Sequence, residues 1–269
     1  MEIQLTGVVE TLLITVRVRA EETLRKDSLL QDPYAVEILE KLNFDKSSKN
    51  KVAASSHIGI VIRTVIFDNI IGDFFKRKPD EVIVNLGCGL DARYKRLNLG
   101  DTKWYDIDVE EAIDIRKQFF QEEKNYKMMP MSMFNFSWMQ YIPKDRPILI
   151  ISEGVMMYFP ERKLEPLFNK IFETFPNVEM ALDTIAPFLA KRTKLHSEVK
   201  KYNAKFQWGL NSEEDLKRWN NKISVLDVKY YFDYYKNRWP ISIRLLMLFP
   251  NMRKWNKIVH IGNSLNMTL

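Results

Sequence analysis

The stretch Glu81-Val-Ile-Val-Asn-Leu-Gly87-Cys-Gly89 decides the fold of this 269-residue chain. A short apolar run that ends in two closely spaced glycines is typical of a buried strand entering a tight turn. Glycine lets the backbone approach a ligand closely, and a helix beginning after the turn offers unpaired N–H groups. We therefore expect a strand followed by a ligand-binding turn; a glycine turn without a ligand is the structural alternative.

Strand-like and helix-like segments alternate after this turn. The strand candidates are residues 103–108, 128–133, 148–153 and 178–184, and helical patterns occupy residues 110–124 and 161–175. Strands that alternate with helices indicate a parallel sheet with crossover helices. Two later β-like segments, near residues 225–235 and 257–261, are expected to extend the sheet.

The residues before the turn are mainly helical in pattern. Residues 11–30 contain no glycine or proline, and Asp32-Pro33 is typical of a helix start, with aspartate as N-cap and proline in the first turn. Residues 58–75 are largely apolar at a helical period and carry one basic residue, Arg63. We predict a helical cap of residues 1–78 and a core of residues 79–269, with a helical insertion around 186–222.

Bulk composition is that of a globular protein, with 46% apolar and 28% charged residues. No apolar run is long enough to span a bilayer, and the N-terminal residues lack the basic region of a secretory signal, so we expect a cytoplasmic protein. The single cysteine, Cys88, excludes an intrachain disulfide, and the three histidines are scattered. No metal site is predicted.

Positive charge is concentrated late in the chain. Residues 186–260 hold 16 Lys and Arg against 6 Asp and Glu, whereas the whole chain has a net charge of +6. Basic residues mixed with aromatic ones fit a nucleic acid, a membrane surface or an anionic substrate. A solvated face over an ordinary core is the interpretation we favour.

The glycine turn by itself fits two nucleotide cofactors. The run from Gly87 through Gly89 to Ala92 matches the dinucleotide fingerprint, and either Asp106 or Asp108, at the end of the next strand, would hold a ribose. A nicotinamide cofactor such as NAD brings a pyrophosphate, whereas S-adenosylmethionine (SAM) brings an amino-acid tail. The tail requires an anion for its ammonium group and a cation for its carboxylate.

Two residues meet the requirements of that tail. Glu153 ends a buried strand where the ligand crevice of a parallel sheet lies, and Arg63 carries a guanidinium that pairs with carboxylates through two hydrogen bonds. Each has a structural alternative: a loop or helix-capping acid for Glu153, and a surface arginine for Arg63. A dehydrogenase does not predict this pair, so SAM is the cofactor we favour.

Motifs along nearly the whole chain resemble the leucine carboxyl methyltransferase superfamily, in particular its bacterial branch of polyketide O-methyltransferases. The motifs that carry the resemblance are Val84-Asn-Leu-Gly-Cys-Gly-Leu-Asp-Ala-Arg93, Tyr105-Asp-Ile-Asp108, Ile151-Ser-Glu-Gly-Val-Met-Met-Tyr-Phe-Pro160, Asp32-Pro-Tyr-Ala, Phe134-Asn-Phe-Ser-Trp138 and Phe206-Gln-Trp-Gly-Leu210. They occur in the family's order. The glycine-Leu-Asp and Glu-Gly blocks are specific in combination.

The resemblance implies a Rossmann-like class I methyltransferase fold: a seven-stranded, mostly parallel sheet with its last strand antiparallel, plus the helical cap. It implies the following contacts with SAM: its carboxylate with Arg63, its methionine portion with Gly87 and Glu153, its ribose with Asp108, and its adenine with Ser132 and Met133. Gly89 belongs to the same turn. Relatives often carry Asp in the block where this chain has Ser132 and Asn135, which makes the adenine contacts the weakest part of the transfer.

The expected activity is methyl transfer from SAM to an oxygen, a carboxylate or a phenol, of a small-molecule acceptor. A carboxylate acceptor needs little acid–base catalysis, whereas a hydroxyl acceptor requires a base, for which His57 and Tyr158 are the weak candidates. The insertion around residues 188–210, with Lys191, Arg192 and Lys194, predicts an anionic or aromatic acceptor.

Several alternatives stay open on the sequence alone. They are an NAD-dependent oxidoreductase, a SAM-binding protein without turnover, a protein C-terminal carboxylate as acceptor, and an RNA acceptor. We expect neither nucleic acid nor a membrane as partner, and the sequence leaves the oligomeric state open.

Overall fold

The structure, a computed structural model, describes residues 8–42, 52–78, 80–191 and 205–263. It begins with three helices, α1 (Val8–Thr23), α2 (Pro33–Lys41) and α3 (Ala54–Arg77). The strands and the other helices then follow in the order β1 (Val82–Leu86), α4 (Arg93–Leu97), β2 (Lys103–Asp108), α5 (Glu110–Arg116), β3 (Tyr126–Pro130), β4 (Ile148–Ser152), α6 (Glu161–Thr174), β5 (Val178–Ile185), α7 (Pro187–Lys191), α9 (Leu216–Trp219), β6 (Ile223–Tyr230), α10 (Ile241–Leu246), α11 (Pro250–Arg253) and β7 (Asn256–Asn263).

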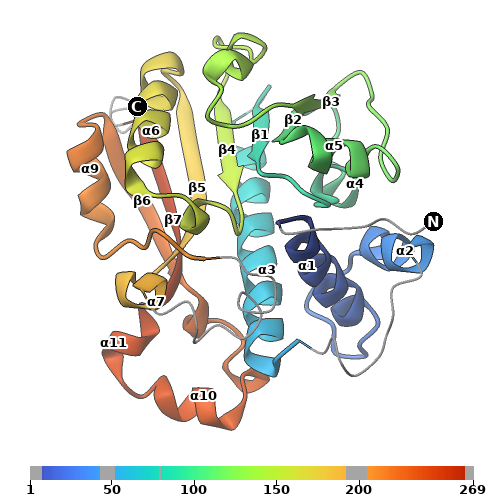
Figure 1. The fold of residues 1–269 in the computed structure, drawn as a ribbon, viewed down its shortest axis with the longest axis vertical. Coiled ribbons are helices and arrows are strands. Elements are labelled where there is room, and N and C mark those ends of the chain that lie inside the picture. The colour runs from blue at the N-terminus through green and yellow to red at the C-terminus, as the bar shows by residue number, and fades with distance from the viewer. Residues whose placement is uncertain (1–7, 43–51, 79, 192–204, 264–269) are drawn as a thin grey trace.

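The seven strands form one sheet in the order β3-β2-β1-β4-β5-β7-β6 (Figure 1). Strands β1 to β5 pair in parallel, and β7 runs antiparallel to both β5 and β6. This arrangement confirms the predicted class I methyltransferase fold with its antiparallel last strand. The chain winds outward from β1 to β3 and then crosses back to β4, so the switch in strand order lies between β1 and β4. Ligands bind at the carboxyl ends of the strands at such a point.

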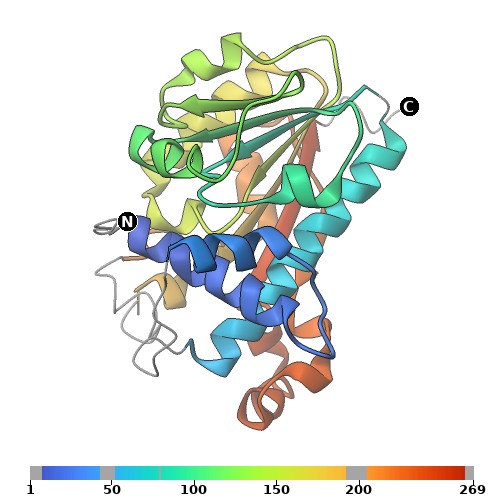
Figure 2. The same cartoon turned by 90° about the vertical axis from the view of Figure 1, so that its right-hand side faces the viewer.

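Helices cover both faces of the sheet. Alternate residues of each strand point to opposite sides, so each strand contributes side chains to both layers of the core. On one face, side chains such as Ile83 and Leu149 pack with the helices α1, α2 and α3. On the other face, Val82 and Ile148 pack with α6 and α9. Figure 2 shows α1, α2 and α3 together beside the sheet. The buried strands therefore carry the near-continuous apolar runs by which the sequence predicted them.

The predicted boundaries differ from the observed ones at several elements, among them β6, which occupies residues 223–230 rather than 225–235. Helix α1 ends at Thr23 rather than at residue 30, because Ser28 and Glu22 hydrogen-bond the backbone of the following turn at Leu30 and Leu29. Helix α5 ends at Arg116 rather than at residue 124, and β3 occupies residues 126–130 rather than 128–133. The division into a cap of residues 1–78 and a core stays a prediction, since α3 contacts β4 and β5 directly. No helix in the described part of the chain has the length and apolar character needed to cross a bilayer.

Candidate active site

A cavity of about 720 Å³ opens at the carboxyl ends of β1, β4 and β5, beside the switch in strand order. Cavities of this size hold cofactors and small molecules. Its wall includes the sequence-predicted residues Arg63, Gly87, Gly89, Glu153 and Tyr158. Residues separated by more than ninety positions in the sequence therefore share one wall.

The glycine turn after β1 requires glycine for two reasons. Gly87 and Gly89 have φ values of +73° and +46°, which side chains rarely tolerate. A Cβ atom on Gly87 would also lie 2.5 Å from Cγ2 of Val155, and one on Gly89 would lie 2.6 Å from Cδ2 of Leu12. The side chain of Arg116 also holds the turn in place, because it donates a hydrogen bond to the carbonyl oxygen of Gly89 at 2.9 Å. The turn is a rigid, close-packed wall of the cavity.

Arg63, on α3, lies between two carboxylates of the sheet. Its Nε donates to Glu153 Oε1 at 2.9 Å, and its Nη1 donates to Asp183 Oδ2 at 3.1 Å. Burial disfavours the guanidinium charge, but Glu153 and Asp183 outweigh it and raise the pKa of Arg63. No described residue accepts a hydrogen bond from its Nη2, so this donor is available for a carboxylate of a ligand. The surface-arginine alternative for Arg63 is thus wrong.

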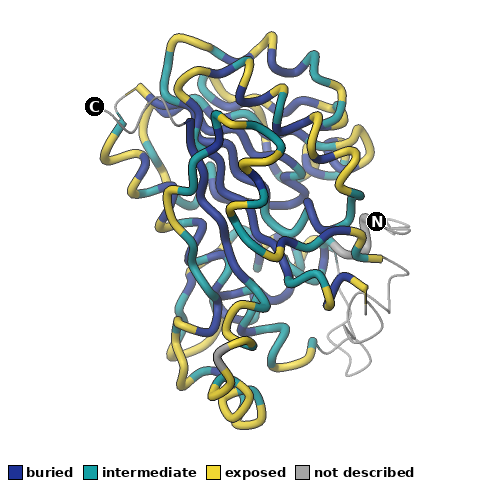
Figure 3. The backbone as a smooth tube through the Cα atoms, turned by 90° about the vertical axis from the view of Figure 1, so that its left-hand side faces the viewer, coloured by how far each residue is buried: buried dark blue, intermediate teal, exposed yellow. Residues whose placement is uncertain are grey.

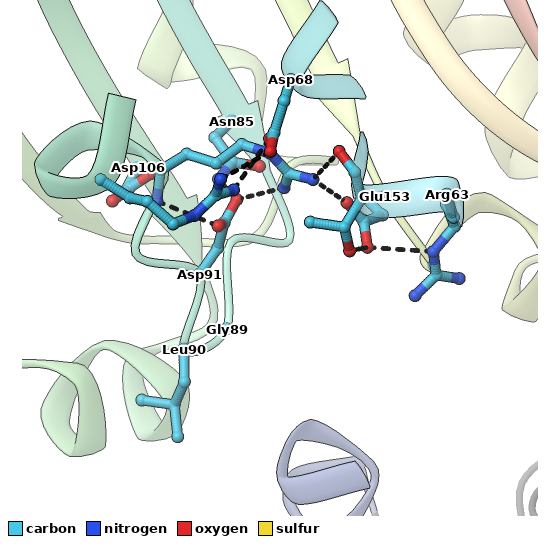
Figure 4. A network of polar contacts seen from close by, with 12 residues as sticks. Arg63, Asp68, Asn85, Gly89, Leu90, Asp91, Asp106 and Glu153 are labelled. Atoms are coloured by element: carbon cyan, nitrogen blue, oxygen red, sulfur yellow. Dashed lines mark hydrogen bonds and ion pairs between the residues drawn. The ribbon is translucent and has the colours of Figure 1, made fainter. Parts of the chain in front are cut away.

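Glu153 is held on its other side by Arg93, which is 2% exposed. Arg93 donates to Asp68 at 2.7 Å, to Asp91 at 2.6 Å and, through Nη2, to Glu153. Figure 4 shows Asp68, Asp91 and Glu153 gathered around these bonds, with Arg63 beyond Glu153. Burial tends to raise the pKa of the Glu153 carboxyl, but Arg93 and Arg63 outweigh burial and lower it. Glu153 therefore stays ionised and faces the cavity as an anion.

The structure separates the two ribose candidates at the end of β2. Asp106 is fully buried and bound to Trp104, Tyr126 and Arg116, so its oxygens are occupied by the protein. Asp108 instead accepts hydrogen bonds from the backbone N–H groups of Gly89 and Val109, each at 2.8 Å. Burial raises the pKa of Asp108 against these two bonds. Asp108 is the carboxylate that adjoins the glycine turn.

The other predicted residues lie at different distances from the cavity. Ser132 is exposed and its Oγ accepts a hydrogen bond from the N–H of Phe134, while Met133 is buried in the hydrophobic core. Neither lines the cavity, and their contact with adenine stays a prediction. His57 is also absent from the wall: its Nε2 lies 3.6 Å from Glu21 of α1. Tyr158 does line the cavity, and burial raises the pKa of its hydroxyl.

Sequence reasoning missed three residues of the site: Arg93, Asp91 and Asp183. Asp183 accepts hydrogen bonds from the N–H of Gly154 at 2.6 Å and from the hydroxyl of Tyr231 at 3.3 Å, in addition to the bond from Arg63. Asp183 could have been found from the sequence, because it lies inside the apolar run of β5 and a buried acid in a strand requires polar partners. Arg93 and Asp91 belong to the motif of residues 84–93, but nothing in that motif predicted a role for either residue.

The far end of the cavity is apolar and aromatic. Its wall there is formed by the following side chains from α7, the segment before α9 and the region between β6 and β7: Phe188, Phe206, Phe232, Trp239, Ile243, Leu246, Met252 and Trp255. Lys191 is exposed at the end of α7 and is not part of the wall, and Arg192 and Lys194 lie outside the described residues. Aromatic side chains, rather than a basic cluster, dominate this end.

We also considered a metal site and a cysteine nucleophile among the described residues. These residues contain no group of three His, Cys, Asp or Glu side chains arranged for a metal ion. Cys88 is buried at 4% exposure, and burial raises the pKa of its thiol well above the ordinary value. A thiol of this kind is a poor nucleophile, so Cys88 serves as a small packing residue.

Comparison with known proteins gives concordant results. A family model of leucine carboxyl methyltransferases matches residues 12–172, more than half of the chain. The tetracenomycin polyketide synthesis O-methyltransferase TcmP of Streptomyces glaucescens is 29% identical over 86% of this chain and 88% of its own length. The SAM-dependent methyltransferase dpfgK of Gibberella zeae is 26% identical over 80% and 79%.

Solved structures share the fold at low sequence identity. A DUF574 family protein from Streptomyces avermitilis superposes with a TM-score of 0.61 at 7% identity, over 93% of this chain and 97% of its own. Magnesium protoporphyrin IX methyltransferase (ChlM) from Synechocystis, with bound SAH, gives 0.50 at 13% identity over 87% and 100%. Fold, sequence motifs and family match agree: the chain belongs to the leucine carboxyl methyltransferase family and is a SAM-dependent methyltransferase.

Proposed function

We propose that the protein transfers the methyl group of SAM to a carboxylate oxygen of an aromatic small molecule. The observation that carries this proposal is the division of the cavity into two ends. One end holds the glycine turn, Arg63 and Glu153, and the other is built from aromatic and aliphatic side chains. The polar end suits the amino-acid tail of SAM, and the aromatic end suits a flat apolar acceptor.

The residues at the polar end fit SAM. Arg63 has the Nη2 donor that a carboxylate requires, and Glu153 provides a fixed negative charge for an ammonium group. Gly87 gives the close backbone approach, and Asp108 retains acceptor capacity for ribose hydroxyls because two backbone bonds use only part of a carboxylate. Ser132 and Met133 complete the proposed site at the adenine.

When bound, SAM would supply an electrophilic methyl group on a positively charged sulfur. The contribution of the chain is to align the acceptor and to exclude water from a largely apolar chamber. Burial raises the pKa of both Tyr158 and Tyr231, so these hydroxyls stay protonated near neutral pH and do not act as bases. The carboxylate of Asp183 already accepts three hydrogen bonds, from Arg63, from the N–H of Gly154 and from the hydroxyl of Tyr231.

This arrangement favours a carboxylate over a phenol as the acceptor group. A carboxylate is already ionised near neutral pH, whereas a phenol has to lose a proton to a base. Among the described residues of the cavity wall, neither the tyrosines nor Asp183 is free to take that proton. The similarity to TcmP, an O-methyltransferase of tetracenomycin polyketide synthesis, supports an oxygen atom as the target.

The first test is calorimetric titration with SAM, SAH and NAD, using the wild-type chain and Asp108→Ala. We expect micromolar binding of SAM and SAH, its loss in Asp108→Ala and no binding of NAD. The matched control is Asp101→Ala, which removes an exposed carboxylate from the turn before β2 and should leave binding unchanged. Binding of NAD in place of SAM would refute the cofactor assignment.

The second test compares pairs of acceptors with the same ring and either a carboxyl or a hydroxyl group. With methyl-labelled SAM, a methyl ester releases labelled methanol in mild base, whereas an aryl methyl ether does not. We expect base-labile product from the carboxylic acids alone. Exclusive formation of base-stable product from the phenols would refute the carboxylate assignment while leaving the cofactor site intact.

A further inference from the structure

Helices α10 and α11 form a projecting tip with exposed apolar side chains. Leu245, Leu248 and Phe249 are 59%, 76% and 61% exposed, and Ile241 is 73% exposed. Figure 1 places both helices at the end of the molecule toward which the parallel strands point, and Figure 3 colours this end mostly as exposed. A cluster of large apolar side chains in water marks a binding surface.

The tip is an anchored part of the fold. At its base, Arg238 donates to the carbonyl oxygen of Asp27 at 2.7 Å and to both carboxylate oxygens of Glu22. Trp239 is 5% exposed and packs edge-on against Phe232, with ring centroids 4.7 Å apart. The apolar residues beyond Trp239 are therefore presented by a fixed base.

Positive charge surrounds the apolar residues. Residues 236–255 contain five Lys and Arg and no Asp or Glu. Of these, Lys236, Arg244 and Lys254 are exposed, and no carboxylate of the described residues lies within ion-pair distance of them. The partner of the tip is therefore expected to be anionic as well as apolar.

A second hollow, of about 500 Å³, lies beside these apolar side chains. Its wall brings together three cations, Lys236, Arg244 and Arg253, with one carboxylate, Asp233, which Arg253 binds. Met247 and Leu248 supply apolar wall next to the cations. This combination matches a phosphate group joined to hydrocarbon, because the cations bind the phosphate and the adjoining wall accepts the chain.

We propose that the α10–α11 tip docks on the surface of a bilayer that contains anionic phospholipid, with a lipid phosphate in the hollow beside Arg244. Apolar side chains at an amphipathic tip insert to the depth of the headgroups, and flanking Lys and Arg attract the anionic surface. A second copy of the chain fits less well, since a symmetric contact would bring two basic tips together. The inference departs from the sequence expectation of no membrane partner.

The position of the tip gives the docking a consequence for the active site. Ile243 and Leu246 of α10 and Met252 of α11 line the aromatic end of the main cavity, while their neighbours Leu245 and Leu248 are exposed. Docking through the exposed side chains therefore places the acceptor end of the cavity at the lipid surface. The docking itself does not depend on which acceptor the enzyme uses.

The test is co-sedimentation of the full chain with vesicles of phosphatidylcholine alone and of phosphatidylcholine mixed with phosphatidylglycerol. We expect binding to the mixed vesicles, weakened by salt, and little binding to the neutral ones. Each exposed cation contributes about fivefold to partitioning, so the triple variant Lys236→Gln, Arg244→Gln, Lys254→Gln should lose on the order of a hundredfold. The variant Leu245→Ser, Leu248→Ser, Phe249→Ser should lose binding to both kinds of vesicle.

The matched control neutralises three exposed lysines elsewhere, in Lys26→Gln, Lys76→Gln, Lys124→Gln. All variants should keep the wild-type melting temperature and SAM affinity, because none of the changed residues lines the main cavity. Equal binding to both vesicle types, no binding, or an equal loss in the control would overturn the proposal. A concentration-dependent dimer that the serine variant abolishes would also overturn the proposal, because it indicates a second copy as the partner. A shift in melting temperature with inorganic phosphate, without vesicle binding, would overturn it too, because it indicates a site for free phosphate.

Discussion

Replacing Arg93 by methionine tests the buried network that fixes Glu153. The guanidinium is the common partner of Asp68, Asp91 and Glu153, and it is 2% exposed. In Arg93→Met, Glu153 keeps Arg63 and Asp68 keeps Arg96, but Asp91 loses its directly bound cation. The main cost is therefore one buried carboxylate without a charged partner.

The size of the effect follows from these contacts. Removing one member of a buried ion pair costs roughly 3–5 kcal/mol, because the remaining charge stays desolvated. For a chain of this size each kcal/mol lowers the melting temperature by about 2–4 °C, so we expect a fall of roughly 10 °C. The variant should also bind SAM more weakly, since the Glu153 carboxylate loses one of its two arginines.

The pH dependence distinguishes this explanation from a simple packing defect. Burial tends to raise the pKa of Asp91, but Arg93 and the other arginines outweigh it and lower the pKa to about 2, against an ordinary value of 3.8. The resulting stabilisation, about 2 kcal/mol, is complete above the ordinary value and is lost as the pH falls through the folded value. Without Arg93, the largest of the charges that oppose burial is removed, so burial raises the folded pKa of Asp91 from its wild-type value, and protonation costs the variant less stability than the wild type.

The assay is urea unfolding of both proteins at about pH 7 and about pH 4, with the free energies of unfolding compared at each pH. The deficit of Arg93→Met should shrink on acidification. The control, Arg96→Met, removes a pair to Asp68 but leaves both hydrogen bonds of Arg93 to Asp91 and Glu153, so SAM affinity should stay unchanged. A deficit below 1 kcal/mol, or one equal at both pH values, would refute the reasoning.

Three further outcomes follow from the site. Gly87→Ala should lower SAM affinity at least tenfold in calorimetry, since a side chain at this φ costs about 1–3 kcal/mol and its Cβ meets Val155; wild-type affinity would contradict this. Cys88 should react with a thiol reagent only after denaturant is added, because burial raises its pKa, and rapid labelling of the native chain would show otherwise. Tyr158→Phe should keep kcat with a carboxylate acceptor within a few-fold, whereas a loss of a hundredfold or more would identify the hydroxyl as a base.

Local sequence pattern predicted the sheet because its strands are buried on both faces. The apolar runs at β1, β4 and β5 have no competing helical period, and the glycines after β1 fix where the first strand ends. Boundaries were less predictable where short polar segments decide them. The end of α1 depends on hydrogen bonds of the Glu22 and Ser28 side chains with the backbone, which compete with continuation of the helix. Such bonds do not show in the hydrophobic periodicity of the sequence.

The site was predictable in part for a similar reason. Gly87 and Glu153 each follow a strand and Asp108 ends one, and the carboxyl ends of parallel strands meet at one edge of the sheet. The bonds of Arg63 to Glu153 and Asp183 join residues 90 and 120 positions apart, and no spacing rule reports such distances. The same holds for Arg93, whose role depends on where α3 brings Asp68.

The two ends of the cavity differ in how much the sequence could predict about them, and this difference explains why the cofactor was identifiable and the acceptor was not. At the polar end, Gly87 and Glu153 follow β1 and β4 directly, where the sheet fixes their positions, and Arg63 joins them from α3. The aromatic end uses Phe188, Phe206, Trp239 and Trp255, which come from short helices and loops that any large apolar side chain could fill. Their chemistry becomes specific only through their arrangement around a common space. If the aromatic end holds the acceptor, as we propose, changes in the elements after β5 should alter the acceptor while leaving SAM binding intact.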